Sequence, residues 1–216
     1  MDKLKEHDFP HDSFIGGFYI SEKICDNLIG FFQENHIDAG PGVIFKDGEE
    51  KVTTTSKDST DLPISPHDDS DASRAYIAAL QSALNSYQEK YKMLTQLSKY
   101  TLTSNWNIQY YKAGGGYKHW HCERPSNNKR LLVWMTYLND VPEGGTHFKY
   151  QNLTTPAKKG LTLIWPTDFT HTHSGQITKH HDKYIITGWM GYIRDDKYEG
   201  SHPPHSQWQD IEEKKQ

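Results

Sequence analysis

Two short stretches of the chain carry side chains that could bind a metal ion. The first, GGGYKHWHCERP, spans residues 114–125 and contains two histidines, a cysteine and a glutamate. In an extended strand, side chains two positions apart project from the same face, with Cα atoms roughly 6.6–6.8 Å apart. His121 could therefore share an ion with either His119 or Glu123. His119 and Glu123 would be roughly 13 Å apart along the strand, too far to bind the same ion, so two ligand pairs stay open.

A third ligand must come from elsewhere in the chain. The second stretch, THTHSG, offers His171 and His173, again two positions apart. Two histidines and one carboxylate on one side of a metal form the facial triad of Fe(II) oxygenases, which leaves other coordination positions open. The residues alone therefore indicate a metal site and leave its ligand set undecided.

The remaining features of the first stretch have simpler interpretations. Its three glycines complete neither the P-loop nor the dinucleotide-binding pattern, so we expect a flexible turn before the metal-binding strand. Cys122 alternates away from the face that carries His121 and Glu123, and we expect it to pack against neighbours.

Length and composition limit the classes of protein to consider. The chain has 216 residues and a formal net charge of −4, which fits one domain and offers no basic surface for nucleic acid. Its two cysteines are too few for a disulfide framework and favour a reduced, cytoplasmic setting. The first residues lack the apolar run of a signal peptide, and no segment is apolar enough for a membrane span. We expect a single domain over residues 1–195, with a catalytic core at about 105–195 and a polar C-terminal extension at 196–216.

The first half of the chain predicts two helices that must support this core. FIGGFYIS is typical of a short strand, and Ser21 can cap a helix over residues 22–35. A longer helix is predicted over residues 72–91, and the polar segment between the two helices reads as an extended loop with short strands. Both helices carry one apolar stripe, formed by Ile24, Leu28 and Phe31 in the first and by Tyr76, Ile77, Leu80, Leu84 and Tyr87 in the second.

The second half predicts a series of strands that would carry the candidate ligands. Short apolar or alternating runs are separated by Gly, Pro and Asn: WNIQYY, LLVWMTYLN, THFKY, LTLIWP and YIITGWMGYI. Helices followed by many short strands favour an α+β fold, with an antiparallel jelly-roll barrel buttressed by the N-terminal helices.

Five motifs in this half occur in a characteristic order. They are YYKAGGGY, RLLVWMTYLNDV, EGGTHF, PAKKGLTLIWP and HSGQITKHHDKYIITGW. In order and spacing, the region from Gln109 to Trp189 resembles the catalytic core of the 2-oxoglutarate and Fe(II)-dependent dioxygenases, in the prolyl 4-hydroxylase-like branch. The resemblance implies a double-stranded β-helix.

The resemblance also implies a choice among the candidate ligands. It assigns the Fe(II) ion to His121, Glu123 and His173, with Glu123 at a position where this branch usually has Asp. His119 and His171, which it leaves without a metal, become candidates for facing the substrate. Apart from the resemblance, Arg130 and Trp134 are further candidates for that role, although a lone arginine before a strand more often forms a surface ion pair and barrel core is an equal possibility for Trp134.

A second set of residues is implied to hold the co-substrate. Lys183, ten positions after His173, matches the lysine that binds the far carboxylate of 2-oxoglutarate. A dianion in a semi-buried barrel needs such a cation. Tyr111 and Thr146 resemble the hydroxyl groups that complete the site, and Trp189 resembles the aromatic residue that closes it.

The implied activity is hydroxylation of an unactivated C–H bond. The resemblance implies that Fe(II), 2-oxoglutarate and O2 take part, that ascorbate can support the reaction, and that the substrate is a prolyl residue of a peptide or protein. Substrate choice should depend on variable loops such as residues 40–72. One alternative is a cupin-type metalloprotein, which would have no use for Lys183. The other is a non-enzymatic jelly-roll module that binds carbohydrate on a groove of tryptophans.

Overall fold

A large antiparallel sheet forms the centre of the computed structural model, which describes residues 3–46, 49–102, 104–124 and 129–193. The hydrogen-bonded order is β1-β2-β14-β11-β16-β9-β7-β3, and β8 pairs with the far end of β16. These strands are β1 (Lys5–Glu6), β2 (Gly16–Tyr19), β3 (Gly40–Pro41), β7 (Thr60–Ile64), β8 (Tyr100–Leu102), β9 (Trp106–Tyr111), β11 (Arg130–Tyr137), β14 (Leu161–Pro166) and β16 (Lys183–Tyr192).

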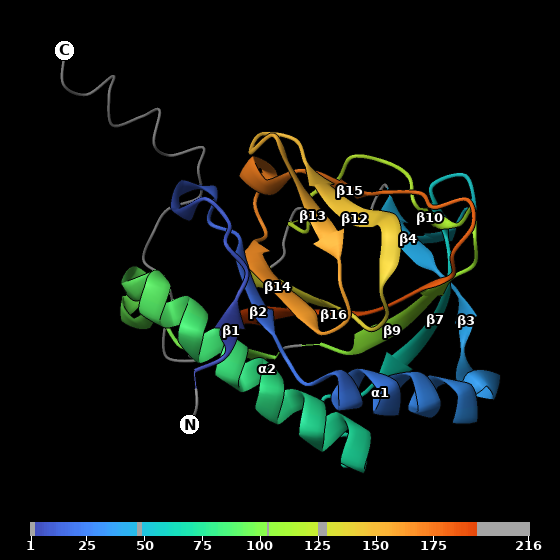
Figure 1. Ribbon diagram of the computed structural model, residues 1–216, viewed down its shortest axis with the longest axis horizontal. Coiled ribbons are helices and arrows are strands. Elements are labelled where there is room, and N and C mark those ends of the chain that lie inside the picture. Colours follow the sequence, from blue (N-terminus) through green and yellow to red (C-terminus); the bar gives the residue numbers. More distant parts are fainter. Residues whose placement is uncertain (1–2, 47–48, 103, 125–128, 194–216) are drawn as a thin grey trace, which may run out of the picture.

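Two helices cover one face of this sheet (Figure 1), namely α1 (Glu22–Glu34) and α2 (Asp71–Lys90). Both lie within a residue or two of the ranges that the sequence predicts. Ser70 caps α2 by accepting a hydrogen bond from the backbone N–H of Ser73, whereas Ser21 precedes α1 without making a side-chain cap bond. The stripes on α1 and α2 pack on the sheet, so the predicted buttress of helices is confirmed.

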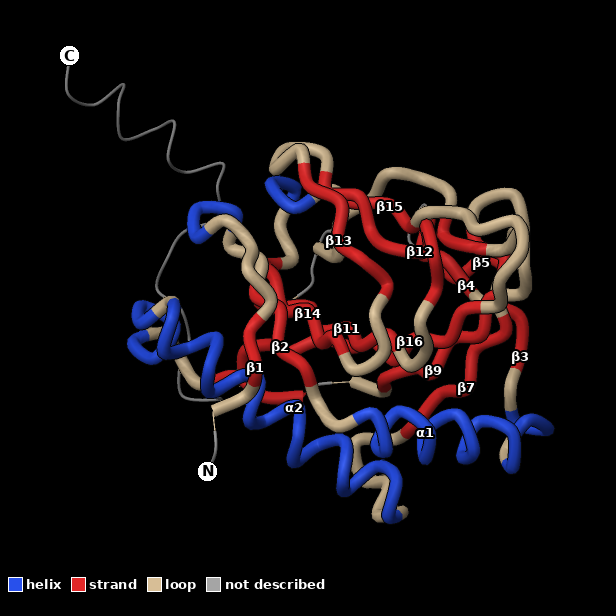
Figure 2. The backbone as a smooth tube through the Cα atoms, viewed as in Figure 1, coloured by secondary structure: helices blue, strands red, loops and turns tan. Residues whose placement is uncertain are grey.

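A smaller sheet packs on the opposite face of the large one (Figure 2). It consists of β12 (Val141–Phe148) between β13 (Leu153–Ala157) and β15 (His173–Gly175). Among the described residues, these strands do not join the large sheet into one closed ladder. The expected α+β jelly-roll architecture is therefore confirmed, in an open form in which the two sheets face each other. Two sheets facing each other leave an open edge, and the candidate ligands lie there.

Alternation along β11 divides the molecule into two cores. Leu132 and Trp134 point toward the helices, whereas Val133, Met135 and Tyr137 point toward the small sheet. Successive side chains of a strand face opposite sides, so a central strand covered on both faces is apolar throughout. The run LLVWMTYL has this composition because it lies at the centre of a sheet with helices on one face and strands on the other.

The polar segment between the helices forms short strands, as expected, at the open edge of the molecule. A hairpin pairs β4 (Val43–Lys46) with β5 (Glu49–Val52), and β6 (Lys57–Asp58) pairs with β10 (Gly116–Tyr117). Four single turns of 3-10 helix complete the described structure, at His11–Ser13, His36–Asp38, Lys92–Gln96 and Phe169–His171. The predicted extension at residues 196–216 lies outside the described residues. No helix within the described ranges is long and apolar enough to cross a membrane.

The EGGT segment of the third motif is part of a strand. It lies inside β12, where the pairing with β13 shifts register between Val141 and Thr146. Gly145 lies so close to the neighbouring strand β13 that a Cβ atom would be 1.7 Å from the backbone oxygen of Thr155. Glycine is therefore required here by close backbone packing.

Candidate metal centre

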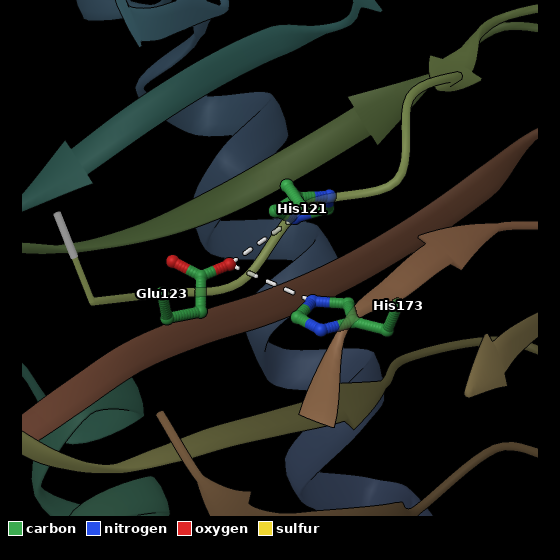
Figure 3. A group of neighbouring side chains, drawn as sticks. All are labelled: His121, Glu123 and His173. Carbon is green, nitrogen blue, oxygen red and sulfur yellow. Dashed lines mark ion pairs between the residues drawn. The ribbon is translucent and has the colours of Figure 1, made fainter. Parts of the chain in front are cut away.

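Three side chains from separate parts of the fold converge at the open edge between the sheets. One ligand atom each from His121, Glu123 and His173 lies within 4.8 Å of the other two, and no other such group of three occurs among the described residues. The Glu123 Oε1 atom is 3.2 Å from Nε2 of His121 and 3.6 Å from Nε2 of His173 (Figure 3). The structure therefore brings together the ligand set that the resemblance implies.

The backbone around His121 positions this group without forming a regular strand. His121 and His173 form an isolated antiparallel bridge, in which each backbone N–H donates to the other residue's carbonyl oxygen at 3.0 and 2.8 Å. Two residues on, the N–H of Glu123 donates to the carbonyl of Thr167 at 3.1 Å. The expectation that His121 and Glu123 lie on a regular strand is thus wrong, because β10 ends at Tyr117. These hydrogen bonds nevertheless keep His121 and Glu123 on one side of the chain.

Both histidines present the same ring nitrogen to the centre. The Nδ1 atom of His121 is 3.0 Å from the carbonyl of His119, and that of His173 is 2.8 Å from the carbonyl of His171. A carbonyl can only accept a hydrogen bond, so Nδ1 carries the proton in both rings. In the neutral rings, Nε2 is then the lone-pair nitrogen. Hydrogen bonds of this kind orient histidine ligands in metal sites.

The electrostatics of the group favour a bound cation. Two imidazole lone pairs face a carboxylate oxygen, an arrangement that is repulsive unless a proton or a metal ion lies between them. Burial lowers the pKa of His173, with the neighbouring His121 adding to the effect, and so keeps the ring neutral. Burial alone would raise the pKa of Glu123, but the hydrogen bonds and positive charge that the two histidines offer when protonated outweigh burial and hold this pKa well below its usual range, so the carboxyl group stays ionised. Two neutral imidazoles and one carboxylate suit a divalent transition metal such as Fe(II).

Aromatic rings fix the two histidines in place. The ring of Tyr117 stacks on His121 with 3.7 Å between centroids and an interplanar angle of 17°. His173 lies between Trp165 and Phe148, whose centroids are 5.2 and 5.6 Å from its own. Sequence reasoning missed Tyr117 as a neighbour of the ligands, because its contact depends on the chain reversing after β10.

Glu123 has partners on its second oxygen as well. The indole N–H of Trp189 donates to Oε2 at 3.0 Å, and the guanidinium of Arg130 lies 3.6 Å from the same atom. The Arg130 guanidinium also lies 3.5 Å from the centroid of the Trp189 ring. Trp189, which the resemblance assigns to the co-substrate, and Arg130, a candidate for facing the substrate, thus both contact a candidate metal ligand.

Lys183 lies buried on the inner face of β16, paired in register with Tyr111 of β9. Its Nζ atom donates to the backbone carbonyls of Gly144 and Gln176 at 3.0 and 3.1 Å. No carboxylate lies within ion-pair distance of this ammonium group among the residues that the structure describes. Burial accordingly lowers its pKa to about 8. A buried cation without an anionic partner is suited to bind an anion.

The two predicted hydroxyl groups are engaged with other side chains. The hydroxyl of Tyr111 donates to Gln109 at 2.6 Å. Thr146 Oγ1 is 2.7 Å from the hydroxyl of Tyr137, which is also 2.9 Å from Thr155 Oγ1. The local motifs do not single out Tyr137, although its parity with the inward-facing Val133 and Met135 could have identified it as part of this polar cluster.

Two residues expected to face the substrate do not do so. Trp134 is fully buried on the helix side of the sheet, where it packs on Tyr76 and Trp106. His171 is 4% exposed, and its Nε2 atom bonds the backbone carbonyl of Ser13 at 3.0 Å. For Trp134 the alternative of a core position is the one that the structure shows, and for His171 the expectation is wrong. Packing with the N-terminal half, which the local motifs cannot reveal, determines where both side chains point. His119 is exposed, and only its backbone carbonyl contacts the ligand group.

Comparison with known proteins finds one family model that matches the part of the chain carrying this geometry. Residues 106–191 match the model of the 2OG-Fe(II) oxygenase superfamily. These residues include Lys183, Trp189 and all three candidate ligands. No curated protein matches the sequence.

Similar solved structures share the fold across most of the chain. A Pseudomonas putida prolyl-4-hydroxylase superposes with a TM-score of 0.63 at 13% identity, covering 84% of this chain and 94% of its own. A viral collagen prolyl hydroxylase from Paramecium Bursaria Chlorella virus-1, solved with 2OG, gives 0.62 at 19% identity, covering 83% and 97%. A Trichoplax adhaerens prolyl hydroxylase, solved with a peptide from a hypoxia inducible factor, gives 0.63 at 15% identity, covering 89% and 88%. These matches confirm the predicted double-stranded β-helix fold.

Proposed function

We propose that this chain, whose residues 106–191 belong to the 2OG-Fe(II) oxygenase superfamily, hydroxylates a prolyl residue of a peptide or protein. The superfamily match makes it a dioxygenase that requires Fe(II), 2-oxoglutarate and O2. The observation that carries the assignment of residues is the convergence of His121, Glu123 and His173 beside a buried lysine without an acidic partner among the described residues.

In this proposal, each member of the candidate metal centre has a defined part. His121 and His173 bind Fe(II) through Nε2, and Glu123 binds it through Oε1. When bound, the iron supplies the redox chemistry that couples decarboxylation of 2-oxoglutarate to oxidation of the substrate. The backbone carbonyls of His119 and His171 hold the two imidazoles in the tautomer that leaves Nε2 free.

The co-substrate lies, in this proposal, on the inner face of the large sheet. The ammonium of Lys183 pairs with its far carboxylate, and the hydroxyls of Tyr111 and Thr146 complete the site. Tyr137 joins this set because its hydroxyl bonds Thr146 directly. Formation of an ion pair would offset the cost of burying the Lys183 charge.

The prolyl substrate is inferred from the structural neighbours. Three of them are prolyl hydroxylases by name, and one was solved with a peptide bound. At identities of 13–19% this likeness concerns the fold, and the chemistry of the substrate is our proposal. Ascorbate would serve only to keep the iron reduced.

We also propose a single domain over residues 1–195 and a cytoplasmic location, the latter because Cys25 and Cys122 are both free. We assign no nucleic-acid or membrane partner.

The test of the activity is turnover with Fe(II) and 2-oxoglutarate. We expect succinate release and O2 uptake by the wild-type protein, and loss of both in His173→Ala, because only two ligands would remain. Full activity of this variant would overturn the ligand assignment. Proline-containing peptides should then gain one oxygen atom by mass spectrometry. Succinate release without any such product would remove the prolyl substrate but leave the oxygenase in place.

Neither alternative interpretation is favoured by the structure. A groove of tryptophans for carbohydrate is not formed by Trp106, Trp134 and Trp165, since all three are buried. A cupin-type metal site offers no reason for an unpaired lysine inside the fold. Loss of 2-oxoglutarate binding in a Lys183 variant that still binds metal would separate the oxygenase from the cupin-type site.

A further inference from the structure

The two oxygens of the Glu123 carboxylate have different surroundings. Oε1 faces the histidine nitrogens, whereas Oε2 accepts a hydrogen bond from the indole N–H of Trp189. The Glu123 side chain is 17% exposed, so water has limited access to it. An indole N–H is a donor only and carries no charge. It can therefore hold a carboxylate oxygen without competing for a metal ion.

Arg130 holds the same part of the glutamate from the other side. Its guanidinium stacks on the Trp189 ring, lies 3.6 Å from Oε2 and donates to the backbone carbonyl of Glu123 at 3.4 Å. By simple alternation with Leu132 and Trp134, this side chain would point toward the helices. The pairing of β11 with β16 is irregular between Arg130 and Leu132. Irregularities of this kind re-aim a side chain, and here Arg130 contacts the inward-facing Trp189.

We propose that Trp189 and Arg130 are positioning residues that allow a glutamate to act as the carboxylate ligand. The inference rests on the proposed function of His121, Glu123 and His173 as iron ligands. Glutamate has one more rotatable bond than aspartate, so its carboxylate must be immobilised at a larger loss of conformational entropy. With Oε2 held by the indole and the guanidinium, a single oxygen faces the histidines. The remaining coordination positions stay open for the co-substrate and O2.

The first test measures metal affinity in the absence of turnover. Trp189→Phe keeps an aromatic ring beneath Arg130, but it removes the indole N–H and makes the ring smaller. We expect Co(II) and Mn(II) to bind this variant about 10-fold more weakly than the wild-type protein, the lower end of what loss of a partner to a metal ligand costs. Titration without 2-oxoglutarate, followed by the visible absorption of Co(II), gives the affinity directly.

Trp165→Phe is the matched control. Its ring packs on His173, but its indole nitrogen has no hydrogen-bond partner among the described residues. The same substitution next to another ligand therefore reduces ring packing without removing a hydrogen bond, and we expect a clearly smaller loss of affinity than in Trp189→Phe. An equal loss of affinity in both variants would mean that ring packing, and not the hydrogen bond to Oε2, determines metal binding, and would overturn the proposal.

A double-mutant cycle with Glu123→Asp tests the role assigned to the longer side chain. The shorter carboxylate cannot both reach the histidines and contact the indole, so Trp189→Phe should have little effect on affinity in the Glu123→Asp background. Equal effects in both backgrounds would contradict the proposed contact. Failure of the wild-type protein to bind Co(II) or Mn(II) at all would instead refute the proposed metal centre. The two failures are thus distinguishable.

Discussion

The two faces of the large sheet have the same strands but different chemistry. Toward the helices, the core consists almost entirely of apolar and aromatic side chains from β9, β11, β16, α1 and α2. Toward the small sheet, apolar side chains share the interior with Lys183, Thr146, Thr155 and His173, all of them buried. One face stabilises the fold, and the other carries the groups that bind ligands.

Neighbouring residues of one strand therefore serve different purposes. Trp134 and Tyr137 of β11 lie three positions apart, yet Trp134 packs under α2 and Tyr137 bonds Thr146. If the division is strict, substitutions on the helix face should lower stability and leave the ligand affinities unchanged. Substitutions on the inner face should change affinity, whether or not they change stability.

The largest effect is expected from removing one indole on each face. Trp134→Ala and Trp165→Ala each delete a fully buried side chain, which typically lowers the free energy of unfolding by about 3–5 kcal/mol. Urea denaturation of the metal-free proteins measures this loss. Only Trp165→Ala should also weaken Co(II) binding, because its ring packs on His173. Equal weakening by Trp134→Ala would show that the two faces are not independent.

Removal of the buried Lys183 charge should lower the affinity for 2-oxoglutarate much more than it changes the free energy of unfolding. Lys183→Met replaces the ammonium by an apolar group of similar length, and we expect 2-oxoglutarate to bind about 10- to 100-fold more weakly, since a charge-assisted hydrogen bond contributes about 1.5–3 kcal/mol. Loss of the two hydrogen bonds to Gly144 and Gln176 destabilises the fold, whereas removal of a buried charge stabilises it. Because these effects oppose each other, we expect the free energy of unfolding to change by about 1 kcal/mol or less. Calorimetry with Mn(II) and 2-oxoglutarate measures the affinity.

Lys57 provides the comparison, since it is equally buried but has a carboxylate partner. It pairs with Asp61, whose side chain is 11% exposed. Lys57→Met would leave that carboxylate unpaired and should destabilise the protein strongly, with a smaller effect on 2-oxoglutarate. The opposite pattern, with Lys183→Met the less stable and Lys57→Met the weaker binder, would contradict the assignment of Lys183 to the co-substrate.

The sequence predicts the elements of both faces better than it predicts which face a residue occupies. Both helices and five of the strands follow from periodicity and from the turns between them, because these signals are local. The run around Trp134 is apolar at almost every position, since both of its faces are covered, and alternation then gives no direction. The inward turn of Arg130 depends on a register irregularity with β16, which is a property of the pairing and not of either strand alone.

For the candidate site, the order of the motifs was more informative than local geometry. Spacing alone left His119 and His171 as alternatives, and the resemblance selected His121, Glu123 and His173, which the structure brings together. Spacing could not reveal that His171 bonds the backbone of Ser13, 158 positions away. Nor could it reveal the contact of Trp189 with Glu123, which joins strand β16 to a segment without regular structure.

A smaller effect is expected from pH. Burial lowers the pKa of Lys183 to about 8, so the protonated form that binds a dianion predominates below that pH. The affinity for 2-oxoglutarate should be constant below about 8 and fall by up to about tenfold per pH unit above it, because binding then requires uptake of one proton. In the unfolded chain the group titrates near 10.5. Stability should therefore rise with pH between the two values, where the unfolded chain holds more protons.

The control for this pH dependence is Lys183→Arg, measured over the same range above neutral pH. A guanidinium stays protonated throughout, so its profile of affinity against pH should be flat even if the affinity itself is lower. A wild-type profile that is also flat, or an arginine profile with the same slope, would mean that Lys183 is not the group that titrates.

The smallest effect compares the same substitution on the two faces. Tyr76 and Tyr137 are both fully buried, and each hydroxyl bonds a threonine: Tyr76 bonds Thr136 at 2.8 Å on the helix face, and Tyr137 bonds Thr146 at 2.7 Å on the inner face. Replacement by Phe should lower the free energy of unfolding by about 1 kcal/mol for Tyr76, the usual net value of one hydrogen bond, and by about 1–2 kcal/mol for Tyr137, whose hydroxyl also lies 2.9 Å from Thr155 Oγ1. Only Tyr137→Phe should also weaken 2-oxoglutarate binding, because Thr146 then loses the partner that orients its hydroxyl. If both variants bind 2-oxoglutarate like the wild-type protein, the Tyr137–Thr146 pair belongs to the structural core. The ligand-binding part of the inner face would then consist of Lys183 and the residues around the metal alone.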